Sequence, residues 1–304
     1  MMKQDRRSFL HATVGGLVGL SAMPLFAAAP RAAAPVALGD RIRVMPGMPG
    51  NVVVLKGGDG LLLVDSGSVE LAPSLLKALG GERVRTLINT HYHADQTGGN
   101  ALFAKAGAEI RAHVITKQWL AADYWSPSQD RWIKAPPREA VPTVTFRERG
   151  AMTSGSEHIE YGYLLEAHTR GDSYVYFRDS NVLAVGDVAS PLRDPVHDWF
   201  AGGWIGGRVD AMDDLLKVAN ADTRIVPAYG AVMTRAQLQA ERDLMSKLFD
   251  KTSQLTAKGH SAKDMLEAGA LKDVGRTFQD PYRFLYDVAK GLQAHYTNFA
   301  GNVV

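Results

Sequence analysis

The 304-residue sequence predicts a mixed α/β protein with layered sheets. In the first two thirds of the chain, short apolar runs typical of buried strands alternate with segments that have the apolar spacing of helices. The last third has helical spacing almost throughout. The composition, with 46% hydrophobic and 22% charged residues, is that of an ordinary globular protein with enough apolar side chains for a sizeable core.

The predicted strands are short and are separated by turn residues. The first two, at 52–55 and 61–64, flank a Gly-Gly-Asp-Gly turn and form a hairpin. Further strands are predicted at 84–88, 109–112, 160–167, 174–177 and 182–185. Helices are predicted at 70–79, 99–106, 114–122, 210–219, 234–257, 261–268 and 284–296.

Residues 123–142 lack clean periodicity and contain four prolines together with Tyr124, Trp125 and Trp132. This composition predicts a long loop, and such loops are usually functional or mobile. Two interpretations stay open: the aromatic side chains shape a binding pocket, or they pack on the core.

The first 34 residues have the order of a signal peptide, with a basic start, an apolar stretch and an alanine-rich end. Arg6-Arg7-Ser8-Phe9-Leu10 resembles the twin-arginine export motif, whose pathway carries folded proteins. We therefore expect residues 1–34 to be removed and residues 35–304 to act in the periplasm, without stable membrane association. An uncleaved membrane anchor is the alternative.

Charge and cysteine content exclude several classes of site. The net charge is +2, with 34 basic and 32 acidic residues and no long run of like charge, so nucleic-acid binding is not indicated. The sequence contains no cysteine, which excludes disulfides and thiolate ligands. A bound metal must therefore be held by nitrogen and oxygen donors.

The chemistry is concentrated in Asn89-Thr90-His91-Tyr92-His93-Ala94-Asp95-Gln96, which directly follows a predicted strand. In extended backbone the side chains of His91, His93 and Asp95 alternate onto one side. Two imidazoles and a carboxylate suit zinc best, although iron or manganese accepts the same donors. The segment therefore predicts a metal site at a strand end.

This histidine motif resembles the signature of the metallo-β-lactamase superfamily, and four other segments agree with that family in order and spacing. They are Leu63-Val64-Asp65-Ser66-Gly67, Ala167-His168-Thr169-Arg170-Gly171-Asp172, Val185-Gly186-Asp187 and Pro227-Ala228-Tyr229-Gly230. The resemblance spans about residues 40–235. It implies a four-layer αββα sandwich with the site at the sheet edges, followed here by C-terminal helices from about 234 to 304.

The resemblance also implies a set of metal ligands, with His91, His93 and His168 holding a first metal. The family holds a second metal with Asp95, Asp187 and two more histidines, but here those two positions are Gln96 and Tyr229. Glutamine is a weak neutral ligand, and tyrosine binds well only as phenolate. The sequence therefore predicts one tightly bound zinc, with iron as the alternative metal, and a weak or empty second site.

The expected function is hydrolysis of a small-molecule ester, thioester, lactone or amide by a metal-bound hydroxide. We expect Asp95 to orient the nucleophile and shuttle a proton, and Tyr229 to donate a hydrogen bond to the oxyanion. One alternative is iron-dependent redox or thiol oxygenase chemistry on the same fold. The other is a non-catalytic metal-binding accessory protein. Neither the substrate nor the oligomeric state follows from the sequence.

Two further segments lie between Asp187 and the C-terminal helices. His197-Asp198 is a candidate part of the substrate pocket. Gly202-Gly203-Trp204-Ile205-Gly206-Gly207 is not preceded by a strand and lacks a following Lys-Ser/Thr, so it is not a phosphate loop. We expect it to form a turn before the helix at 210, with Trp204 as a possible pocket residue.

Overall fold

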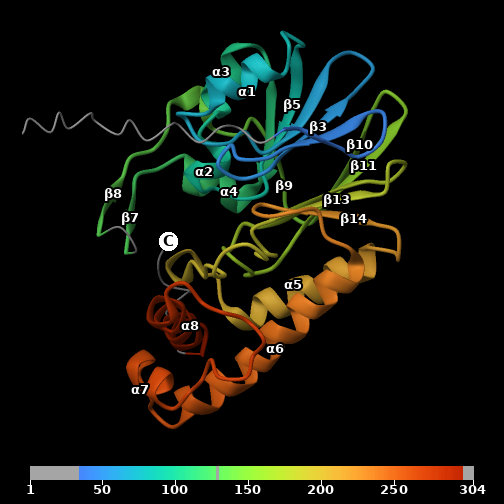
Figure 1. Cartoon of the computed structure of the whole chain (residues 1–304). Helices are drawn as coiled ribbons and strands as arrows, with labels where there is room; N and C mark the ends of the chain where they lie inside the picture. Colours follow the sequence, from blue (N-terminus) through green and yellow to red (C-terminus); the bar gives the residue numbers. More distant parts are fainter. Residues whose placement is uncertain (1–33, 128–129, 297–304) are drawn as a thin grey trace, which may run out of the picture. The chain divides into compact units, whose positions relative to one another are not determined.

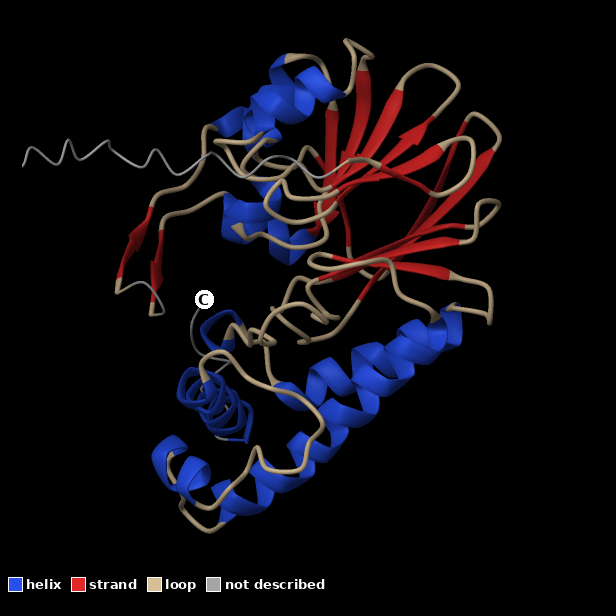
Figure 2. Ribbon diagram, viewed as in Figure 1, coloured by secondary structure: helices blue, strands red, loops and turns tan. Residues whose placement is uncertain are grey.

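The computed structural model describes residues 34–127 and 130–296 (Figure 1). The predicted signal peptide therefore lies outside the described residues, apart from Ala34. Two large sheets face each other, and helices cover their outer faces (Figure 2). This is the four-layer αββα arrangement that the sequence predicts.

The first sheet has seven strands in the order β1-β2-β3-β4-β5-β6-β9. Their bounds are β1 Val36–Ala37, β2 Ile42–Met45, β3 Val52–Lys56, β4 Leu61–Val64, β5 Val84–Ile88, β6 Glu109–His113 and β9 Val144–Phe146. The first four strands pair antiparallel, whereas β4 to β9 pair parallel. Parallel pairing brings the carboxyl ends of β4, β5 and β6 to one edge, where functional loops of such sheets gather.

The second sheet has five strands in the order β10-β11-β12-β13-β14. Their bounds are β10 Arg149–Ser154, β11 Glu157–Tyr163, β12 Ser173–Phe177, β13 Val182–Gly186 and β14 Arg224–Pro227. Only β13 and β14 pair parallel. The predicted strand at 160–167 ends earlier, at 163, because the chain turns there into the loop that carries His168.

Alternating side chains of the strands build separate apolar layers. On β4, Leu62 and Val64 face the second sheet, where they meet Val175 and Phe177 of β12. Leu63, their neighbour on the same strand, lies on the other face in the layer under the helices. The two-residue period of a strand thus fills both layers, which explains why the strand reads as a continuous apolar run.

The helices cover the two outer faces. The first sheet is covered by α1 (Ala72–Ala78), α2 (Ala94–Thr97), α3 (Asn100–Lys105) and α4 (Val114–Leu120). The C-terminal part of the chain forms α5 (Ile205–Val218), α6 (Arg235–Ala257), α7 (Ala262–Glu267) and α8 (Pro281–Tyr296). Buried residues of these later helices pack in one core cluster with Leu183 and Val185 of β13.

The predicted long loop at 123–142 is corrected by the structure. It contains a small antiparallel hairpin of β7 (Tyr124–Ser126) and β8 (Arg131–Ile133), followed by a 3₁₀ turn, η1 (Arg138–Ala140). Trp125 lies opposite Trp132 in the register of this hairpin. The strands are only three residues long, too short to show a period in the sequence.

The glycine-rich segment is also corrected, because α5 begins at Ile205 and includes Gly206 and Gly207. A Cβ atom on Gly207 would come within 2.2 Å of the carbonyl oxygen of Glu166. A Cβ on Gly203 would come within 2.0 Å of the carbonyl oxygen of His168. The glycines therefore allow the start of α5 to pack directly against the His168 loop.

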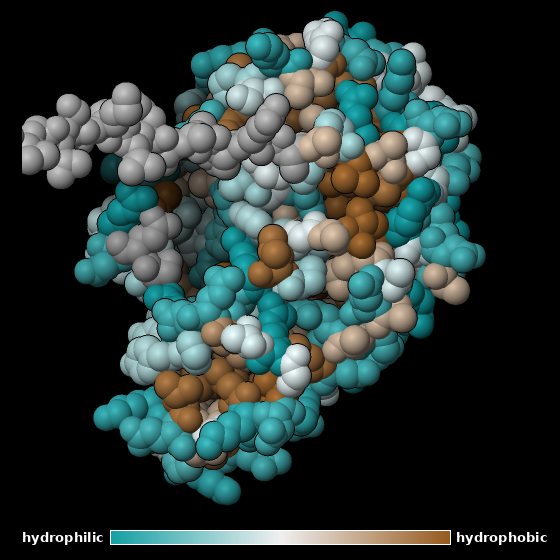
Figure 3. Space-filling view, in the orientation of Figure 1, coloured by the Kyte–Doolittle hydropathy of each residue, from teal (hydrophilic) through white to brown (hydrophobic). Residues whose placement is uncertain are grey.

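Apolar residues come to the surface between the two sheets and among the C-terminal helices, whereas most of the surface seen in Figure 3 is hydrophilic. Among the helices of the described residues, none combines the length and apolarity needed to cross a membrane.

Candidate metal centre

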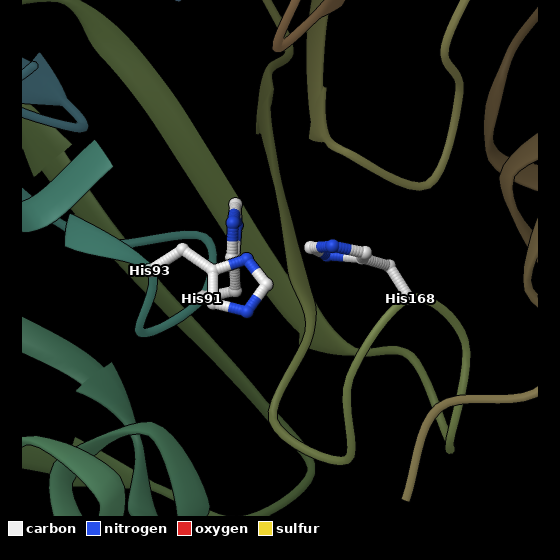
Figure 4. A group of neighbouring side chains, drawn as sticks. All are labelled: His91, His93 and His168. Carbon is white, nitrogen blue, oxygen red and sulfur yellow. The ribbon is translucent and has the colours of Figure 1, made fainter. Parts of the chain in front are cut away.

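Three histidines converge at the edge of the two sheets (Figure 4). His91 and His93 lie in the turn between β5 and α2, and His168 lies in the loop between β11 and β12. One nitrogen from each ring lies within 4.8 Å of those of the other two. His91 and His168 are buried, whereas His93 is partly exposed. The structure thus brings together the three histidines that the sequence predicts as ligands of the first metal.

Each ring has a polar neighbour beside one nitrogen, within hydrogen-bond distance at His91 and His93 and slightly farther away at His168. The Nδ1 atom of His91 lies 3.0 Å from the Thr90 hydroxyl, which donates its proton to Asp65. The Nε2 atom of His93 lies 2.9 Å from Asp198 Oδ2. The Nδ1 atom of His168 lies 3.6 Å from Asp172 Oδ1. Such outer partners fix the tautomer and direction of metal-binding imidazoles.

The remaining nitrogens fit a metal ion. Within the described part of the chain, Nε2 of His91 and both ring nitrogens of His168 are buried without a hydrogen-bond partner. Buried polar atoms are rarely left unpaired in folded proteins, and a bound metal ion would pair with these nitrogens. Burial and the neighbouring histidines lower the pKa of His91 to about 3, which keeps this ring neutral. Neutral imidazoles with free lone pairs are the form in which histidine binds metals.

The loop that carries His168 is held by Asp172. One of its carboxylate oxygens accepts hydrogen bonds from the backbone N–H groups of His168 and Thr169, each at 2.6 Å. The other oxygen accepts from the Thr169 hydroxyl at 3.0 Å. This carboxylate therefore shapes the backbone of the loop and also lies beside the His168 ring.

Asp198 links the metal centre to an aromatic cluster. Its carboxylate accepts hydrogen bonds from the Tyr92 hydroxyl and from His93. Burial alone would lower the pKa of His93 and raise that of Asp198, but the hydrogen bond between them, together with nearby opposite charges, outweighs burial in both cases. His197, its neighbour in the sequence, is instead buried and lies 5.8 Å from the Phe284 ring, centroid to centroid.

The second metal position of the family is held differently. Asp95 and Asp187 both face Arg193, whose guanidinium bonds to Asp187 and whose Nη1 lies 3.9 Å from Asp95 Oδ2. The Arg193 Cζ atom also lies 3.6 Å from the centre of the Tyr229 ring. Burial by itself raises the pKa of Asp187, but the nearby charges of His168 and Arg193 outweigh it and hold the pKa well below its ordinary value. A guanidinium therefore supplies positive charge between these two carboxylates.

Tyr229 and Gln96 take up the two positions where the family has histidines. The Tyr229 hydroxyl donates a hydrogen bond to Asp95. Burial and the charge of Asp95 raise the pKa of this phenol above its ordinary value, so it stays protonated rather than becoming a phenolate ligand. The Gln96 amide is buried, and neither of its polar atoms has a hydrogen-bond partner among the described residues. This position therefore offers a protonated phenol and a neutral amide beside Asp95 and Asp187.

Arg193 is fixed by a residue far along the chain. The guanidinium of Arg276 donates hydrogen bonds to the carbonyl oxygens of Arg193 and Ser190. Arg276 is itself paired with Glu241 of α6 at 2.9 Å. The C-terminal helical region thus contributes to the position of Arg193.

Sequence reasoning missed several of these residues. It assigned no role to Arg193, which lies in a proline-flanked loop without a recognisable pattern. Asp65 and Asp172 belong to segments that resemble the family, yet only the structure reveals their contacts with Thr90 and with the His168 loop. A signal for Asp198 existed, because the sequence marked His197-Asp198 as a pocket candidate.

Comparison with known proteins agrees with this geometry. The profile of the metallo-beta-lactamase superfamily matches residues 45–230, more than half of the chain. A type 2 metallo-beta-lactamase from Bacillus cereus is 24% identical over 203 residues, which cover 65% of this chain and 73% of the relative. The alpha subunit of 2,4-dinitroanisole O-demethylase from Nocardioides sp. is 25% identical over 248 residues, covering 77% of this chain and 65% of the relative.

Two solved structures share the fold. A metallo-beta-lactamase from Pontibacter korlensis has a TM-score of 0.57 and 17% identity, and the match covers 70% of this chain and 98% of that one. A stereoselective inverting sec-alkylsulfatase from Pseudomonas sp. has a TM-score of 0.60 and 17% identity, with 86% of this chain and 50% of that chain covered. Together with the family profile, these matches place the chain in the metallo-beta-lactamase superfamily.

Proposed function

We propose that this protein is a hydrolase that uses one zinc ion, held by His91, His93 and His168, to cleave a carbonyl ester, thioester, lactone or amide. The observation that carries the proposal is the cluster of three imidazoles, in which Nε2 of His91 and both ring nitrogens of His168 are buried without a hydrogen-bond partner among the described residues. The family is mostly hydrolytic and generally metal-dependent. The names of its relatives include a lactamase, an O-demethylase and an alkylsulfatase, so the family does not identify the substrate.

His91, His93 and His168 would hold the zinc ion, which would supply Lewis acidity for a carbonyl group and lower the pKa of a bound water to about 7. The chain's own residues prepare the site for this chemistry. Thr90, Asp198 and Asp172 orient the three rings, so that the ligand nitrogens face one another without rearrangement.

Asp95 is the proposed general base. Its Oδ2 atom accepts the hydrogen bond of Tyr229, whereas Oδ1 makes no hydrogen bond within the described residues. Oδ1 is therefore the atom that would take the proton of the attacking water. Tyr229 stays protonated and can turn its O–H from Asp95 to the oxyanion that develops on the substrate.

Arg193 supports the proposal that only one metal is needed. Its guanidinium lies against Asp187 and near Asp95, so a second divalent ion would have to displace a cation that is already paired. Arginine stays charged at every working pH and does not dissociate. We assign Asp187 to this ion pair, although the sequence suggested it as a metal ligand.

We further propose that the protein acts in the periplasm on a small molecule, after export by the twin-arginine route. The support is the order of basic, apolar and alanine-rich residues in the first 34 positions. Export in the folded state suits a protein that must load its metal beforehand.

Metal analysis together with a hydrolysis screen tests the proposal. The purified protein should contain about one zinc per chain and cleave at least one member of a panel of aryl esters, thioesters, lactones and β-lactams. Bound iron in place of zinc would favour redox chemistry. A zinc-loaded protein that cleaves none of the panel would contradict the hydrolase proposal.

A further inference from the structure

A large cavity with aromatic walls lies beside the metal centre. Its volume is about 1140 Å³, above the ~300–1,000 Å³ of common small-molecule pockets. Residues of α4, the β7–β8 hairpin, the 3₁₀ turn η2 (Trp199–Ala201) and α8 line it. Six of the lining side chains are aromatic, namely Trp119, Tyr124, Trp125, Trp132, Trp199 and Phe200.

The walls of this cavity rest on the residues that orient His93. The Trp119 ring stacks on Tyr92 with 4.9 Å between ring centroids and 18° between planes. Tyr92 in turn donates its hydroxyl proton to Asp198, the partner of His93, and Trp199 directly follows Asp198 in the chain. The cavity is therefore connected to His93 through Trp119, Tyr92 and Asp198.

Aromatic walls suit two kinds of guest, a flat aromatic ring or an organic cation. The charges lining the cavity distinguish between them. Asp123 is paired with Lys134 at 2.6 Å, and Arg170 lies 3.5 Å from Glu166, so both of these lining charges already have an opposite charge beside them. Lys290 also lines the cavity, and its positive charge disfavours a cationic guest.

Lys290 also favours an anionic group on the guest. It is half-buried, and its nitrogen lies 5.7 Å from the centre of the Tyr286 ring. Within the described residues it forms no ion pair with a carboxylate. A carboxylate or sulfonate on the guest would supply that missing partner.

We propose that this cavity binds the substrate and that the substrate is a flat aromatic molecule of at least two rings that carries a negative charge. That the bound molecule is a substrate rests on the proposed hydrolase function. Binding in the cavity does not require hydrolysis. The bond to be cleaved would lie at the end of the molecule nearest His93.

Calorimetric titration of the zinc-loaded protein with three probes tests the proposal. 2-Naphthoate has the proposed rings and charge, 2-naphthylmethylammonium has the rings with the opposite charge, and octanoate has the charge on a flexible chain. We expect 2-naphthoate to bind most tightly. Equal or tighter binding of octanoate would overturn the aromatic assignment, equal or tighter binding of the ammonium probe would overturn the charge assignment, and no binding of 2-naphthoate would overturn the whole proposal.

Two variants with matched controls locate the binding. Trp132 is 62% exposed, so Trp132→Ala should fold normally and weaken 2-naphthoate binding about three- to tenfold. Lys290→Gln should weaken it about two- to fivefold. Tyr282→Ala, which removes an exposed aromatic ring from α8 outside the cavity lining, and Lys263→Gln on α7 should leave it unchanged. Unchanged affinity in both cavity variants would show that the probe binds elsewhere and would overturn the proposal.

The metal-free His91→Ala/His93→Ala variant separates this proposal from the hydrolase proposal. It should still bind 2-naphthoate. If the intact protein binds 2-naphthoate but cleaves no ester, thioester or amide of naphthoic acid or of a smaller acid, the hydrolase proposal fails and the binding site stands. If it cleaves small esters but does not bind 2-naphthoate, only the cavity assignment fails.

Discussion

The two metal positions of the superfamily lie side by side in this chain and are built from opposite kinds of groups. At the first, three imidazoles lie together, and Nε2 of His91 and both ring nitrogens of His168 have no hydrogen-bond partner among the described residues. At the second, two carboxylates and a phenol surround a guanidinium. The first position offers nitrogen donors to a cation, whereas the second already contains a cation, the guanidinium of Arg193.

This difference supports the proposal that the protein uses one metal and that a guanidinium supplies positive charge at the second position. A buried carboxylate such as Asp187 is costly unless a cation pairs with it. In the two-metal members that cation is a metal, and here it is Arg193. We propose that Gln96, Tyr229 and Arg193 belong together, with the guanidinium supplying the positive charge that a second metal ion would bring.

The largest expected effect comes from the first position. His91→Ala/His93→Ala should abolish metal binding and lower kcat/KM by at least about 1,000-fold, because the metal contributes several kcal/mol to the reaction. Mass spectrometry of the bound metal and steady-state kinetics measure both effects. Retained activity in the metal-free variant would place the chemistry elsewhere.

A second prediction converts the second position into a metal site. Gln96→His/Tyr229→His/Arg193→Ala should bind two metal ions per chain instead of one, because two imidazoles and two released carboxylates then face the same point. The matched variant Gln96→His/Tyr229→His, which keeps Arg193, should still bind one. Two metals in this matched variant would show that Arg193 does not exclude the ion.

Removal of the guanidinium alone tests its structural role. Arg193→Met should lower the free energy of unfolding by about 2–3 kcal/mol, less than the ~3–5 kcal/mol of a fully buried pair, because Arg193 is partly exposed. Urea unfolding in the presence of a chelator measures this change, and Arg193→Lys, which keeps the charge, should lose less. Equal stability of all three proteins would contradict the role assigned to the ion pair.

Substitution of Asp198, the hydrogen-bond partner of His93, should have a smaller effect, and that effect should be on the affinity for the metal. Asp198→Asn removes the negative charge beside the ring and should weaken zinc binding about 10- to 100-fold. Competition with a chromophoric chelator measures this affinity. Asp179→Asn, which changes an exposed aspartate paired with His158, is the matched control. An unchanged zinc affinity in Asp198→Asn would mean that His93 needs no such support.

The smallest effect is expected for the phenol. Tyr229→Phe should lower the turnover number about tenfold, the magnitude of one hydrogen bond to a charged group, while metal content stays the same. Loss of zinc in this variant would instead make Tyr229 a ligand. Tyr282→Phe, at an exposed tyrosine, serves as the control.

The sequence predicted the cluster of three histidines because they lie in compact motifs that follow strands. His91 and His93 come directly after β5, and a single loop carries His168. Arg193 could not be predicted in the same way. Its place depends on a contact with Arg276, 83 residues further along the chain, and no local pattern records that contact.

The fold shows the same division between local and distant causes. Strands and helices with a clear period were predicted within a few residues, for example α6 at 235–257. The start of α5 was misplaced, because Gly206 and Gly207 usually mark a turn. Here Gly207 lets the helix pack closely on the loop that carries His168. This is a contact between distant segments, which the local sequence does not reveal.

The hydrogen bonds from Arg276 tie the position of Arg193 to the part of the chain after the last strand. The family profile ends at residue 230, before helix α6, which holds Glu241, and before the loop between α7 and α8, which holds Arg276. A shortened protein that stops after the last strand would retain every imidazole ligand and both carboxylates. It would lack the hydrogen bond from Arg276 to the backbone of Arg193. The C-terminal region therefore helps to position a residue of the site, in addition to packing on the second sheet.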